Sequence, residues 1–138
     1  MSVKTQISDL VLSSRGVADV TRVSAVLIAA VVASVAAGTA LGVSIGSQSA
    51  DPDLALVVRF MAFVKAALAM GAAGLVYWRL QSPLSPARAY GYIAAAALMA
   101  SSPGLVWFTA WPMLASIAFH GGLLSGLVLA FRDDGLRR

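Results

Sequence analysis

Cysteine and glutamate are absent from this sequence of 138 residues, and charged residues of any kind are few. Without cysteine, the sequence offers no disulfide, thiolate metal site, iron–sulfur cluster or cysteine nucleophile. All six acidic residues are aspartates, and each lies outside the long apolar runs. We therefore expect no carboxylate within the membrane spans.

The composition is that of a membrane protein. Apolar residues make up 59% of the chain and charged residues 12%, whereas charged residues are about 25% of a soluble domain. The formal net charge is +4, but lysine and arginine are scattered at segment ends and do not form a basic stripe. This distribution argues against nucleic-acid binding.

Four apolar runs divide the chain, and a helix needs about 20 apolar residues to cross the hydrocarbon core of a bilayer. They predict an all-α integral membrane bundle of four transmembrane helices with short loops. The expected spans cover residues 23–45, 53–78, 86–101 and 112–131. Residues 1–22 then form an N-terminal segment, and residues 132–138 form a short tail.

Two features of the N-terminal part leave alternatives. Residues 1–22 are polar but carry apolar side chains at near-helical spacing, which fits either an amphipathic helix on the membrane surface or a frayed tail. The first apolar run could also belong to a signal peptide. It is longer than a signal core of about 7–15 residues and follows a long polar leader, so we expect a retained span.

The remaining boundaries depend on serine, aspartate and proline. Asp51-Pro52 and Ser85-Pro86 have the cap-then-proline pattern of a helix start. The turn between the third and fourth spans is less clear, because 101–104 (SSPG) and 110–112 (AWP) both read as breaks. We expect the third span to end at Ser101 and residues 103–111 to lie at the membrane interface. The alternative is a helix kinked at Pro103 that continues to Thr109.

Basic residues outside the spans predict the orientation. Eight of them lie before the first span, between the second and third, or after the fourth, and none lies in the other two loops. By the positive-inside rule, both termini are then cytoplasmic. We expect a multi-pass protein of a bacterial-type inner (plasma) membrane, in contact with the lipid bilayer.

Small residues recur every fourth position in two of the spans, which lets helix backbones approach closely. In the first span the ridge includes Ser34, Gly38, Gly42 and Gly46, and in the fourth it includes Gly122 and Gly126. We expect these helices to pack on each other or on copies of the chain.

Three basic side chains are the candidate intramembrane site. Lys65 lies near the middle of the second span, where an ammonium group costs roughly 3 kcal/mol on insertion scales. His120, the single histidine, is expected at a similar depth in the fourth span. Together they could contact an anion or a carbonyl, or simply bond within a packed bundle. Arg59 lies nearer the membrane surface, where it can reach the headgroups or pair with Asp51 or Asp53.

The residues show no catalytic constellation and no nucleotide loop, so the sequence predicts neither an enzyme nor a cofactor. A metal site would depend on His120 with Met113 and Met61, and one histidine with two thioethers is a weak ligand set for copper or haem. We therefore expect no metal site. The favoured function is a non-catalytic accessory subunit or assembly factor that packs against other membrane subunits. The alternative is a homo-oligomeric channel or carrier for an anion or small solute, lined by Lys65 and His120.

Overall fold

Four helices form the whole of the described fold. A computed structural model describes residues 3–45 and 51–133, with side chains from residue 20 onward in the first helix. The helices are α1 (Val3–Ile45), α2 (Pro52–Leu80), α3 (Pro86–Trp107) and α4 (Pro112–Phe131). Each contains a segment long and apolar enough to cross a membrane, which in α1 is Val20–Ser44. The predicted all-α fold with four membrane-spanning helices is confirmed.

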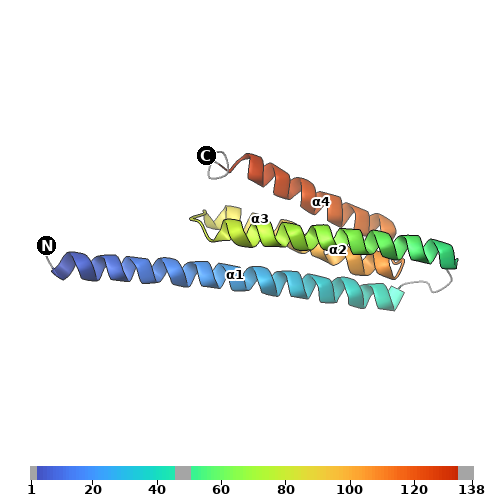
Figure 1. Cartoon of the computed structure of the whole chain (residues 1–138), viewed down its shortest axis with the longest axis horizontal. Helices are drawn as coiled ribbons and strands as arrows, with labels where there is room; N and C mark the ends of the chain where they lie inside the picture. The colour runs from blue at the N-terminus through green and yellow to red at the C-terminus, as the bar shows by residue number, and fades with distance from the viewer. Residues whose placement is uncertain (1–2, 46–50, 134–138) are drawn as a thin grey trace.

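The helices run alternately up and down, so that α1 begins and α4 ends at the same end of the bundle (Figure 1). We call this the terminal end. Helix α1 continues without a break from Val3 into the membrane span, and its first turns extend past the other three helices (Figure 1). Residues 3–22, for which the sequence left a surface helix or a frayed tail open, are thus helical and continue into the span; their position on the membrane surface stays a prediction.

The starts of α2 and α3 follow the local sequence. The Asp51 carboxylate accepts a hydrogen bond of 3.1 Å from the backbone N–H of Asp53, and Pro52 occupies the first turn. Ser85 is the N-cap of α3 with Pro86 behind it, although its hydroxyl makes no capping bond. Both predicted helix starts are confirmed. Proline is favoured at these positions because a residue in the first helical turn has no helical partner for its N–H, so proline loses no hydrogen bond there.

Helix α3 passes through Pro103 and ends at Trp107, so the boundary predicted at Ser101 is wrong. The Ser101 hydroxyl bonds the Leu98 carbonyl at 2.8 Å and does not break the helix. Proline is tolerated within a membrane helix where neighbouring helices enclose it. The turn comes later, where Thr109 and Trp111 have positive φ angles of 55° and 44°.

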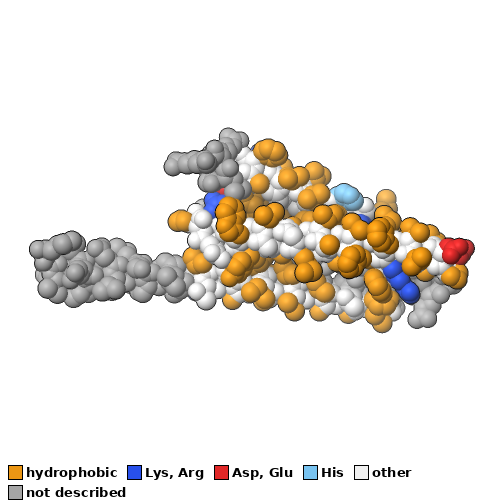
Figure 2. Space-filling view, viewed as in Figure 1, with side chains coloured by type: hydrophobic (Ala, Val, Ile, Leu, Met, Phe, Trp, Pro, Cys, Tyr) orange, Lys and Arg blue, Asp and Glu red, His pale blue; other side chains and the backbone are white. Residues whose placement is uncertain are grey.

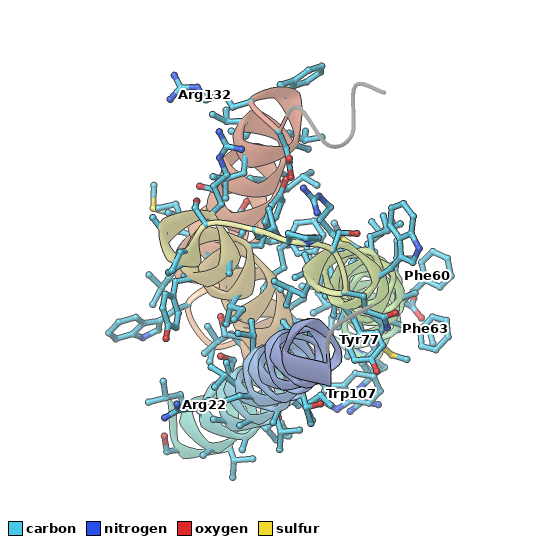
Figure 3. The ribbon with its side chains drawn as sticks, turned by 90° about the vertical axis from the view of Figure 1, so that its left-hand side faces the viewer. Arg22, Phe60, Phe63, Tyr77, Trp107 and Arg132 are labelled. Carbon is cyan, nitrogen blue, oxygen red and sulfur yellow. The ribbon has the colours of Figure 1, made fainter. Side chains whose placement is uncertain are left out.

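Helix α3 is the centre of the bundle and packs against each of the other three helices. In an apolar stretch of 18 residues of α3, 56% of the residues are buried, compared with 11–17% in the corresponding stretches of the other helices. The outer faces of α1, α2 and α4 carry exposed large apolar side chains (Figure 2). Figure 3 shows Phe60 and Phe63 of α2 directed away from the bundle, as expected for a surface in contact with lipid.

Both small-residue ridges lie against α3. A Cβ atom added at Gly38 would collide with the Ser101 carbonyl oxygen, and one at Gly42 would lie 2.6 Å from the Gly104 carbonyl oxygen. On the α4 side, a Cβ at Gly122 would lie 2.6 Å from the Ala95 carbonyl oxygen. The predicted contact between the two ridges is therefore replaced by two separate contacts with α3.

The other ridge positions are less closely packed. Ser34 is half-buried. A Cβ at Gly126 would meet only the Ala95 Cβ, at an ordinary 3.8 Å. Gly46 lies outside the described residues. Close backbone approach is thus required at Gly38, Gly42 and Gly122.

Candidate functional site

Lys65 and His120 both contact Phe119. Lys65 is half-buried near the middle of α2, and its Nζ lies 5.4 Å from the centroid of the Phe119 ring on α4. The His120 ring packs edge-on against the same phenyl ring, with 5.6 Å between centroids. The structure thus brings the two predicted residues to one flank of the bundle, which we call the Phe119 flank. They are joined by an aromatic ring and not by a direct bond.

His120 faces outward from the middle of α4. Its Nδ1 atom lies 2.8 Å from the Ser116 carbonyl oxygen and 3.2 Å from the Ser116 hydroxyl. A carbonyl can only accept, so the short bond assigns the proton to Nδ1 and leaves Nε2 of the neutral ring as an acceptor. Figure 2 shows the histidine at the surface of the molecule. The ring can therefore bind a donor that approaches from outside.

The Phe119 ring is a weak partner for the ammonium group of Lys65 near the middle of the membrane. The face of the Phe119 ring attracts the ammonium group through its quadrupole, at about 0.5–1 kcal/mol. No carboxylate in the described part of the chain lies within ion-pair distance of Lys65. The charge of Lys65 thus remains largely uncompensated within these residues.

Arg59 is separate from this flank. Its guanidinium lies over the Trp107 ring of α3, 5.7 Å from the centroid, and the side chain is exposed. Arg59 makes no ion pair with Asp51 or Asp53, both of which the structure describes. Stacking on an interfacial tryptophan lets the arginine keep its charge near the membrane surface.

A polar cluster that the sequence did not predict lies at the terminal end, between α2, α3 and α4. Arg79, in the last turn of α2, donates two hydrogen bonds of 2.7 Å to the carboxylate of Asp133, which follows α4. The Tyr92 hydroxyl of α3 donates to the same carboxylate at 3.2 Å, and Arg88 Nη1 lies 4.0 Å from it. We call these four residues the Asp133 cluster.

Asp133 lies outside the apolar runs, as expected, but it is 1% exposed, so the end of the bundle buries a carboxylate. Removing a carboxylate from water is costly, and a bidentate arginine with a further hydroxyl donor compensates that cost. The bonds from Asp133 to Arg79 and Tyr92 connect the end of α4 to α2 and α3. A sequence signal existed: in an antiparallel bundle of four helices, the end of the second helix and the end of the fourth are at the same end.

An apolar groove of about 320 Å³ lies between α2 and α4, with α3 as its floor. We call it the α2–α4 groove, and its lining includes Ala72 and Arg79 of α2, Tyr92 and Met99 of α3, and Gly122 and Ala130 of α4. Small side chains on all three helices leave this space unfilled. The groove begins beside the Asp133 cluster and runs toward the Phe119 flank.

Among the described residues, no group of three histidine, cysteine or acidic side chains could hold a metal ion. Comparison with protein-family models, with curated proteins and with solved structures finds no match for the chain. Its function is therefore inferred from the geometry of its own side chains.

Proposed function

We propose that this small four-span membrane protein is a non-catalytic subunit of a larger membrane assembly, which it joins through the Phe119 flank. The distribution of basic residues supports an orientation with both termini in the cytoplasm of a bacterial-type cell. The connections between the helices are short and leave little room for a catalytic unit between the spans.

The observation that carries the proposal is the exposed imidazole of His120. It is the ninth residue of the 20-residue helix α4, and it therefore lies near the middle of the membrane. Ionisable side chains at this depth normally face the interior of a bundle or a water-filled cavity. An outward-facing imidazole with Nε2 available indicates that the bundle is completed by another transmembrane helix.

Lys65 specifies the chemistry of that partner. Its ammonium group approaches the same flank with only a phenyl ring as its counterpart. A carboxylate from a partner helix would neutralise it, and a hydroxyl or amide N–H of the same helix could donate to Nε2 of His120. We therefore propose a partner helix that carries an aspartate or glutamate at the depth of Phe119.

Native mass spectrometry of the tagged protein, extracted in mild detergent from its host membrane, tests this function. Wild type is expected to carry a foreign polypeptide at fixed stoichiometry, and His120→Leu is expected to lose it while remaining folded. Ser125→Leu is the matched control, because Ser125 is an exposed polar residue on a different face of α4. Equal retention by both variants would contradict the proposal.

A homo-oligomeric channel or carrier is the second candidate, favoured by the meeting of Lys65 and His120 on one flank. If copies of the chain face a common axis with this flank, two basic side chains per subunit would line a path for an anion. The same spectra distinguish the two functions, since this arrangement gives a single polypeptide in a fixed multiple.

A further inference from the structure

Measured along the helix axes, the α2–α4 groove is nearly as long as one leaflet of a bilayer is thick. Along α2 it runs from Ala72 to Arg79, about 10 Å at 1.5 Å per residue, and along α4 from Gly122 to Ala130, about 12 Å. Half of a hydrocarbon core of about 30 Å is about 15 Å. The groove therefore matches the reach of an acyl chain from one leaflet.

The groove ends near the middle of the membrane. Phe119 is buried against Ala69 of α2 and Met99 of α3, and the ammonium group of Lys65 lies over its ring. These side chains fill the space between α2 and α4 beyond the groove. The open space is therefore confined to one half of the membrane, which is the extent of a lipid acyl chain.

The other end of the groove is positively charged. Arg79 and Tyr92 belong to both the groove and the Asp133 cluster, in which the described side chains supply two guanidinium groups and one carboxylate. Arg79 uses Nε and Nη2 to bond Asp133, and its Nη1 makes no hydrogen bond in the described part of the chain. Basic pockets between membrane helices bind anionic lipid headgroups.

We propose that the α2–α4 groove binds one anionic phospholipid, with an acyl chain between α2 and α4 and its phosphate beside Arg79 and Arg88. Trp78 lines the same groove and lies one residue before Arg79, as an interfacial aromatic does beside a headgroup. The groove continues from the Phe119 flank toward the terminal end along the same faces of α2 and α4, and the lipid site does not depend on the identity of a protein partner.

Native mass spectrometry with added lipid tests the site. The purified protein is titrated with phosphatidylglycerol or with phosphatidylcholine of the same acyl chains. One phosphatidylglycerol is expected to be retained, and phosphatidylcholine is expected to bind about fivefold more weakly. This factor corresponds to the attraction between one arginine and the net negative charge that phosphatidylglycerol has and phosphatidylcholine lacks. Equal retention of the two lipids would overturn the proposed headgroup contact.

Variants test the two parts of the site. Gly126→Leu and Ala130→Leu fill the groove and are expected to lose the lipid, whereas Gly121→Leu retains it because a Cβ at Gly121 meets open space. If Gly126→Leu does not fold, Ala130→Leu decides the outcome. Retention of the lipid by folded groove variants would overturn the acyl-chain site.

The charge is tested at Arg88, whose side chain is 43% exposed. Arg88→Gln is expected to remove the preference for phosphatidylglycerol, leaving both lipids bound equally. Arg22→Gln is the control, because Figure 3 shows Arg22 on α1, on the opposite side of the bundle from α4. An unchanged preference in Arg88→Gln would contradict the proposed position of the phosphate.

Discussion

The Asp133 cluster and the Phe119 flank both bring charged or titratable side chains into an apolar bundle, but their geometry differs. In the first, a carboxylate that is 1% exposed accepts bonds from Arg79 and Tyr92. In the second, Lys65 meets only the face of a phenyl ring, and His120 is exposed. The closed cluster is suited to stabilising the fold, and the open flank to contacting another molecule.

The largest loss of stability is expected from Asp133→Ala, which leaves the guanidinium of Arg79 buried without its carboxylate. Breaking one side of a buried ion pair costs about 3–5 kcal/mol. Denaturant titration in detergent micelles measures this loss, and Asp53→Ala, at an exposed residue, is the control. The double variant Arg79→Met/Asp133→Leu should recover most of the loss, since it leaves no unpaired charge.

The next largest effect is expected where the helices cross most closely. Gly42→Leu forces a side chain against Gly104 and Phe108, and overpacking of this kind costs about 1–3 kcal/mol. Gly74→Leu is the control, because a Cβ at Gly74 meets nothing within 4 Å. Equal unfolding midpoints for the two variants would show that the α1–α3 contact does not hold the bundle together.

A smaller loss is expected from Tyr92→Phe, which removes one of the donors to Asp133 and leaves the arginine pair in place. A hydrogen bond of this type contributes about 1 kcal/mol. The same titration measures it, with Tyr90→Phe as the control because Tyr90 is exposed. A loss as large as that of Asp133→Ala would mean that the hydroxyl and not the arginine stabilises the carboxylate.

The smallest effect on stability is expected at the open flank. Lys65→Met removes a cation–π contact of about 0.5–1 kcal/mol but keeps most of the side-chain volume. The variant should remain folded in detergent and lose the partner chain in native mass spectra. An unfolding loss comparable to that of Asp133→Ala would place Lys65 among the structural residues and remove the contrast between the two regions.

The number of helices and the starts of α2 and α3 could be predicted because they depend on local patterns, namely apolar length and cap-then-proline pairs. The end of α3 could not. A serine–proline–glycine stretch is a common signal for a helix end, but here α1 packs against Ser101 and Gly104 and encloses the turn that contains Pro103. This is a tertiary effect on a local signal.

The candidate site was predictable in part. Mid-membrane position alone identified Lys65 and His120, but not Phe119, which requires knowing how α2 and α4 sit around α3. The Asp133 cluster was missed because Asp133 follows an apolar run and reads as part of a solvated tail. Its burial depends on Arg79, which is 54 residues earlier in the chain.

The most direct test of the open flank is photo-crosslinking from two exposed apolar positions in intact membranes. One probe replaces Ile117, on the same side of α4 as His120, and the other replaces Val32 of α1; both native residues are 62% exposed. We expect a single discrete protein adduct from position 117 and only lipid adducts from position 32. The same products from both positions, or no protein adduct from position 117, would contradict the account.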